Sequence, residues 1–259
     1  MALARKDASL HLLRQKVAEA DSDALRFLRG PNTELALWLR FCNGNIDEAA
    51  RRSLEKAAWR KKIGKVSMGD ISRGFSTDGY ALCLGGLKAR NGAPIVYSHG
   101  LPRGNEAQLR RQTVYMQERV LDACDNSRSL KGRGICAPLT IIDCKQPSFR
   151  SPDKALRRGG IDVVARYYPW SNKGTSLFLG VPLALKGIFK LARPFFPKDM
   201  YNRFQLVESR EDIVREGHVD RKQLPKYLGG TSSWSLQTYV PRRCLSERAL
   251  CKPPPRGGL

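Results

Sequence analysis

The chain lacks the residue patterns on which most catalytic and metal sites depend. It has three histidines, at positions 11, 99 and 218, and none of its seven cysteines forms a Cys-x-x-Cys pair. Local spacing therefore predicts no metal site. The Gly-x-Ser-x-Gly turn, the glycine loop that ends in Gly-Lys-Ser/Thr and the His-Glu-x-x-His motif do not occur either. We expect a protein that is not an enzyme and that needs no cofactor.

The sequence also has no apolar run long enough to cross a bilayer. Its most apolar segment contains an uninterrupted run, Leu177–Leu185, of nine residues that includes Gly180 and Pro182. A spanning helix needs about 20 apolar residues. At the start of the chain, charged residues 5–7 interrupt the stretch that a secretory signal would require. An odd number of cysteines cannot all pair internally. We expect a reduced, cytoplasmic protein that associates with membranes transiently.

Acidic residues are scarce relative to basic ones. Lys and Arg number 46 against 24 Asp and Glu, a net charge of +22, which favours a polyanionic partner such as nucleic acid or an anionic membrane surface. The cations are interleaved with regular hydrophobic patterns and do not form one low-complexity run. Nucleic acid is the less favoured partner, because the pattern supplies no platform of exposed aromatic rings for base stacking.

The first part of the chain predicts a small helical bundle. Residues up to about 62 place apolar side chains at helical spacing in four short segments, separated by capping and breaking residues. The last of these segments has a small apolar face and, on its other side, a basic face. The basic face consists of Arg51, Arg52, Lys56 and Arg60.

From about residue 79 the pattern changes to strands that alternate with helices, which is typical of an α/β layer. The predicted strands are 93–97, 139–143, 176–179 and 203–207, and the predicted helices are 106–124, 151–168, 182–196 and 210–216. The expected organisation is a helical module over residues 8–75, an α/β domain over 79–231 and a flexible basic tail with Pro and Gly over 232–259.

The predicted helix 182–196 is amphipathic in an unusual way. One stripe is bulky and apolar, and a neighbouring stripe carries only cations, an arrangement that suits a membrane interface. An ordinary surface helix that covers a sheet would also fit this pattern. The apolar stripe consists of Leu185, Ile188, Phe189, Ala192 and Phe196, and the cationic one of Lys186, Lys190 and Arg193.

The order of these signals resembles the CRAL-TRIO family of lipid-binding and lipid-transfer proteins. The segments that carry the resemblance are Leu39-Arg40-Phe41, residues 46–50, Leu54, Trp59-Arg60, Ala93–Tyr97, Thr140–Asp143, Tyr167-Tyr168-Pro169, Gly180-Val181-Pro182, Arg193–Phe196 and Gln223–Thr231. Together they span about residues 22–231 in the family order. The resemblance is therefore more specific than any single motif.

The resemblance implies an α/β fold, with an N-terminal helical bundle followed by an α/β/α sandwich. A mixed sheet would floor a hydrophobic pocket, and the helix 183–196 would act as a gate. The implied function is to bind one lipid and to exchange it between membranes, with a phospholipid favoured. Two alternatives stay open. One is a lipid sensor that docks a protein partner, for example through the basic tail at Arg242, Arg243, Arg248, Lys252 and Arg256. The other is a carrier of a neutral terpenoid of the retinoid or tocopherol kind.

The family pattern is kept only in part around the lipid headgroup. Members that bind phosphatidylinositol place a Glu-Arg pair after Tyr-Tyr-Pro, where this chain has Trp170 and Ser171. Met200 replaces a threonine, and Arg203 keeps the charge of a lysine. Inositol-lipid specificity is therefore in doubt.

The resemblance assigns candidate site residues to three groups. The residues similar to those around a choline headgroup are Thr140 and Tyr168, although Pro138 and Val164 replace two serines, and both matching residues also suit plain packing roles. With Arg203 they form the expected headgroup site. The expected pocket and gate residues are Tyr97, Phe178, Leu185, Ile188, Phe189, Ala192 and Phe196. The expected membrane-facing cations are Lys186, Lys190 and Arg193.

Overall fold

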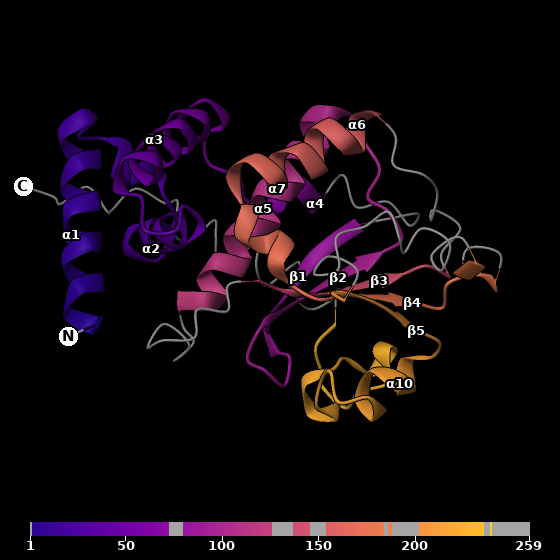
Figure 1. The fold of residues 1–259 in the computed structure, drawn as a ribbon. Coiled ribbons are helices and arrows are strands. Elements are labelled where there is room, and N and C mark those ends of the chain that lie inside the picture. Colours follow the sequence, from indigo (N-terminus) through magenta and orange to yellow (C-terminus); the bar gives the residue numbers. More distant parts are fainter. Residues whose placement is uncertain are drawn as a thin grey trace, which may run out of the picture.

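The chain folds into a group of helices at its amino terminus and a five-stranded mixed sheet after them (Figure 1). The structure, a computed structural model of the chain, describes residues 2–72, 80–125, 137–145, 154–183, 186–187, 202–235 and 239. The predicted α/β class and the N-terminal helical region are both confirmed.

The N-terminal helices are α1 (Ala2–Ala20), η1 (Ala24–Phe27), α2 (Pro31–Phe41), α3 (Ile46–Ile63) and α4 (Met68–Ser72). Their ends follow from local chemistry. Pro31 occupies the first turn of α2 after Gly30, which has a left-handed φ of 55°. Asn45 caps α3 by accepting a hydrogen bond from the Glu48 backbone N–H at 3.0 Å. The apolar faces of α1, α2 and α3 meet around Leu13, Leu35 and Trp38.

The sheet has the strand order β1 (Tyr80–Lys88), β2 (Pro94–His99), β3 (Leu139–Asp143), β4 (Ser176–Leu179) and β5 (Phe204–Val207). β1 pairs with β2 antiparallel, and the other neighbours are parallel. The four predicted strands correspond to β2–β5. The pattern did not predict β1, because Gly85 and Gly86 interrupt its alternation and its register with β2 shifts between Cys83 and Lys88.

The helices of the α/β domain lie on both sides of the sheet. They are α5 (Glu106–Asp125), α6 (Lys154–Leu156), η3 (Arg157–Ile161), α7 (Asp162–Tyr167), η4 (Pro169–Lys173), α10 (Arg210–Arg215), η6 (Arg221–Gln223) and η7 (Lys226–Leu228). α5 and α7 lie on one side of the sheet and α10 on the other (Figure 1). The predicted helix 151–168 is interrupted in its middle by the π-helical turn η3, which contains Gly159 and Gly160.

The helical module and the α/β domain share one hydrophobic core. Trp59 of α3 stacks on Tyr167 at 4.0 Å between ring centroids, and Trp38 of α2 meets Trp170 edge-on at 5.1 Å. Arg29 holds Asp122 of α5 through two hydrogen bonds of 2.6 and 2.9 Å. These contacts fix the module against α5 and the segment that follows α7.

Candidate lipid-binding face of the sheet

The two faces of the sheet are buried to different degrees. Paired residues of parallel strands point to the same side, and successive residues of one strand alternate between sides. On the α10 side, the residues of β2–β4 are buried with Val219, Leu224 and Leu228. On the other side, the outward residues of β3, β4 and β5 are half-buried. We call this second set the open sheet face: Thr140, Ile142, Ser176, Phe178, Phe204 and Leu206.

The open sheet face lies beside the part of the sheet that α5 covers. Val96 of β2 and Cys83 of β1 are buried against Val120 and Leu121 of α5. Among the described helices on this side, α5 therefore covers β1 and β2 more than β3–β5. Figure 1 shows α5 lying above β1 and β2. A half-buried, largely apolar surface is the kind of lining that an apolar ligand needs.

The polarity of the open sheet face changes along β3 and β4. One cross-strand row joins Thr140, Ser176 and Phe204, and the next joins Ile142, Phe178 and Leu206. Arg203 directly precedes β5, and its carbonyl accepts a hydrogen bond of 2.8 Å from the Ser176 N–H. Phe178 and Phe204 pack edge to face, with centroids 5.6 Å apart. Such a surface can orient an amphiphile.

The predicted site residues Thr140 and Phe178 thus share one face, and the Arg203 backbone adjoins it at Ser176. Tyr97 does not join them. The register pairs Tyr97 with Ile141 and Leu177, so its side chain lies on the α10 side. There its hydroxyl donates a hydrogen bond of 3.2 Å to Asp143 Oδ2, and its ring packs on Tyr227. Burial, together with the Asp143 charge, raises the pKa of Tyr97.

Tyr168, the second predicted headgroup residue, lies in the core that joins the two parts of the chain. Its side chain is fully buried, and the Lys56 Nζ lies 3.6 Å from its ring centroid. Trp59 and Trp170 both meet it edge-on. Burial raises the pKa of Tyr168. Within the part of the chain that the structure describes, its hydroxyl has no hydrogen-bond partner. These contacts are those of a side chain that packs in the core. They differ from the contacts that a headgroup-binding residue would make.

Replacement of Tyr168 by phenylalanine separates these two roles. Because the buried hydroxyl is unsatisfied, its removal is expected to leave the free energy of unfolding unchanged or to raise it by up to about 1 kcal/mol. Lipid content is expected to stay at the wild-type level. Urea unfolding and native mass spectrometry would measure the two quantities. A variant that folds normally and loses its lipid would show that the hydroxyl contacts the headgroup.

The predicted membrane-facing residue Lys186 makes an ion pair. Its Nζ lies 2.7 Å from Glu208 Oε1, just after β5, and this hydrogen bond lowers the pKa of Glu208. Nearby, the side chain of Leu183 is 83% exposed. The other predicted gate and membrane residues lie outside the described residues: Leu185, Ile188, Phe189, Lys190, Ala192, Arg193 and Phe196.

Four residues of the open sheet face were not predicted: Ile142, Ser176, Phe204 and Leu206. Strand alternation places Ile142 on the same face as Thr140, so the sequence carried a signal for this residue. For β4 and β5 the alternation alone is ambiguous, because each strand has only four residues. Their register with β3 decides which side chains share the face.

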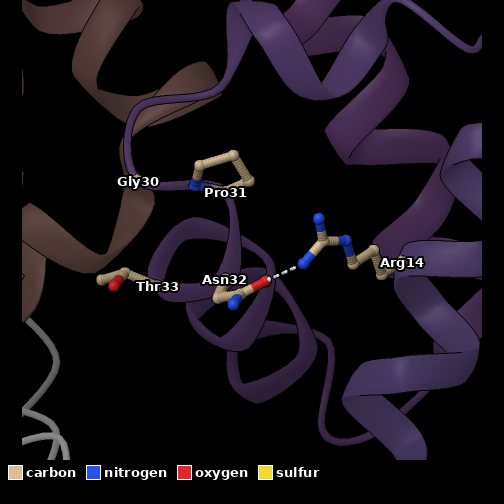
Figure 2. Close-up of a pocket in the computed structure, with 5 residues that line it drawn as sticks. All are labelled: Arg14, Gly30, Pro31, Asn32 and Thr33. Carbon is tan, nitrogen blue, oxygen red and sulfur yellow. Dashed lines mark hydrogen bonds between the residues drawn. The ribbon is translucent and has the colours of Figure 1, made fainter.

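A cavity lies in the helical module, away from the sheet. Its volume is about 360 Å³, and it is lined by Arg14 of α1 and by residues 30–33 at the start of α2 (Figure 2). The Arg14 Nη1 donates a hydrogen bond of 3.0 Å to Asn32 Oδ1, which links the two helices across it. Arg14 is exposed, so this cavity is a surface cleft.

The described residues carry neither a metal-binding cluster nor a membrane-spanning helix. There, no three or more His, Cys, Asp or Glu side chains are grouped so that they could hold a metal ion. Over the same ranges, none of the helices combines the length and the hydrophobicity needed to cross a membrane.

The described elements define an α/β domain whose sheet carries a half-buried, largely apolar face. A family profile described as the CRAL/TRIO domain matches residues 90–230, more than half of the chain. The chain therefore belongs to the CRAL/TRIO domain family, as the motifs predicted.

The crystal structure of Sfh5 is similar over 95% of this chain and 98% of that one, with a TM-score of 0.50 and 12% sequence identity. This likeness concerns the fold. No curated protein sequence matches the chain.

Proposed function

We propose that the protein binds one phospholipid on the open sheet face and exchanges it between membranes. Members of the CRAL/TRIO domain family bind and transfer lipids. The observation that carries the proposal is the half-buried apolar row Ile142, Phe178 and Leu206, which adjoins the row of Thr140, Ser176 and Phe204. The apolar side chains would take the acyl chains, and the hydroxyls of Thr140 and Ser176 with Arg203 would take the headgroup.

The energetics favour exchange over one-way release. Each buried CH₂ of a lipid contributes about 0.8 kcal/mol, but a bilayer offers nearly the same burial. Net transfer is therefore close to neutral in free energy, and the barrier is the passage of the chains through water. The protein needs no covalent chemistry for this task, which agrees with the expected absence of a catalytic set and of a cofactor. The proposed place of action is the cytoplasmic side of membranes, with transient attachment.

The choice among phospholipids follows from two positions next to the Tyr-Tyr-Pro motif. Trp170 is buried against Trp38 in the shared core. The Ser171 Oγ donates a hydrogen bond of 2.5 Å to Gln117 Oε1 of α5. Both side chains are engaged within the protein, so these positions offer no partners for inositol hydroxyls. This supports a phospholipid with a smaller hydrogen-bonding demand, such as phosphatidylcholine.

Native mass spectrometry of the purified full chain tests the proposal, with vesicle-to-vesicle transfer of fluorescent phosphatidylcholine as the second measurement. We expect one copurifying phospholipid for each chain and transfer faster than spontaneous exchange. A bound lipid that never exchanges would contradict transfer and favour the lipid sensor. A bound retinoid or tocopherol would contradict the phospholipid assignment. A ligand-free protein without transfer activity would contradict the whole proposal.

A further inference from the structure

The helical segment α6–η3–α7 presents a basic surface that the proposed function does not use. Lys154, Arg157 and Arg158 are all exposed and follow one another at helical spacing i, i+3 and i+4. None of the three forms an ion pair within the described part of the chain. Ile161, at i+7, is 49% exposed. We call these four residues the basic stripe.

The position of the basic stripe is set by glycine. A Cβ at Gly159 would lie 2.5 Å from the Glu106 carbonyl oxygen and 2.9 Å from the Leu109 Cβ, both in α5. Only glycine lets the π-helical turn η3 approach α5 so closely. With this side packed on α5, the stripe faces away from it. α7 is held as well, because the Arg166 Nε donates a hydrogen bond of 2.6 Å to Glu55 of α3.

We propose that the basic stripe is a docking surface for an anionic membrane, separate from the predicted helix 182–196. Three cations next to a half-exposed isoleucine match a bilayer interface, where phosphates meet the charges and the apolar side chain enters the acyl boundary. The one exposed acid on the adjoining turn is Asp162. The proposal concerns adsorption of the protein and holds whether or not the open sheet face carries a lipid.

A membrane fits this surface better than nucleic acid. Binding of single strands uses exposed aromatic rings on which bases stack. Among the described residues of the α/β domain, the large hydrophobic side chains with high exposure are Ile161 and Leu183, which are both aliphatic. An aliphatic side chain beside cations offers burial to a lipid and no stacking to a base.

Co-sedimentation of the full chain with vesicles tests the docking surface. The variant K154A/R157A/R158A is compared with the control R221A/K222A/K226A, which removes three exposed cations from η6 and η7, near α10 on the far side of the sheet. At low salt, with vesicles of phosphatidylcholine and phosphatidylserine, each stripe cation is expected to contribute about fivefold to partitioning. The stripe variant should therefore bind roughly 100-fold less tightly, and the control should lose far less.

A second variant tests the apolar part of the stripe. Ile161→Asn keeps every charge and should weaken binding at high salt as well, because apolar burial is not screened. Equal losses in the two triple variants would show that net charge alone drives binding and would overturn the proposal. Unchanged binding of the stripe variant would also overturn it. Native mass spectrometry of the same samples measures the bound lipid. A failure of the proposed lipid binding is therefore distinguished from a failure of membrane docking.

Discussion

Replacement of Lys56 by methionine is expected to lower the free energy of unfolding by about 3–5 kcal/mol. Lys56 is 1% exposed and forms an ion pair with Glu34, which is 0% exposed. Its Nζ also lies over the rings of Tyr168 at 3.6 Å and Trp170 at 4.9 Å. Without the ammonium group, the Glu34 carboxylate would be a buried charge whose hydrogen-bond donor among the described residues is the Arg29 backbone N–H, at 2.7 Å.

The pH dependence of the stability of Lys56→Met tests whether the unpaired Glu34 carboxylate causes the loss. Burial raises the pKa of Glu34, and the neighbouring Lys56 opposes that shift. Without Lys56 the pKa of Glu34 in the folded state rises further above its unfolded value. A carboxyl group with a raised folded-state pKa destabilises the fold when ionised, so stability falls as the pH rises through that pKa. We therefore expect the variant to be closer to the wild type in mildly acidic buffer than at neutral pH.

Urea unfolding measures these differences, with two comparisons. Lys62→Met removes an exposed lysine from the same helix and should change stability by less than about 0.5 kcal/mol. The double variant E34Q/K56M leaves no unpaired charge and should recover much of the loss. If Lys56→Met were no more destabilising than Lys62→Met, the buried ion pair would make no net contribution to stability.

Replacement of Phe178 by aspartate is expected to abolish lipid binding while the protein stays folded. Phe178 lies in the middle of the apolar row of the open sheet face and is only half-buried. A carboxylate placed against acyl chains costs several kcal/mol in desolvation. This corresponds to a loss of affinity of roughly 100-fold or more. The partial exposure of the position allows the charge to reach water in the lipid-free protein.

The matched control is Gln205→Asp, which introduces the same acidic side chain in the next strand of the sheet. Gln205 pairs with Leu177 and thus lies on the opposite face from Phe178. Lipid content by native mass spectrometry should fall in the Phe178 variant and stay near one per chain in the control. Thermal unfolding reports whether each variant is folded. A folded Phe178→Asp protein that keeps its lipid would place the ligand elsewhere.

The basic face predicted for α3 shows where reasoning from the pattern stopped. Arg51 and Arg52 are on the outside and bind Glu48 of the same helix. Lys56 is buried and Arg60 is half-buried; they pair with Glu34 of α2 and with Glu118 of α5, the latter at 2.5 Å. Helical spacing places all four cations on one face of α3. It does not indicate which of them another element covers. The partners come from elements that are distant in the sequence.

The open sheet face shows the same limit for strands. The hydrophobic runs predicted β2–β5, and the motifs predicted that Thr140 and Phe178 belong to the site. Tyr97 was grouped with Phe178, but the pairing of β2 with β3 turns its side chain to the α10 side. A shift of one residue in register changes the face of every side chain in a strand. The sequence of one strand carries no information on the register of its neighbour.

The sequence alone determined the local features of this protein: which segments are helices or strands, where glycine and proline end them, and to which family the order of motifs belongs. These features depend on contacts between residues a few positions apart, so they can be predicted from the sequence. Tertiary structure decided which strand residues share the half-buried face, which cations are covered in ion pairs and which stay exposed on α6 and η3. Those properties depend on pairing and packing between described segments up to 135 residues apart, where burial and desolvation outweigh local preference.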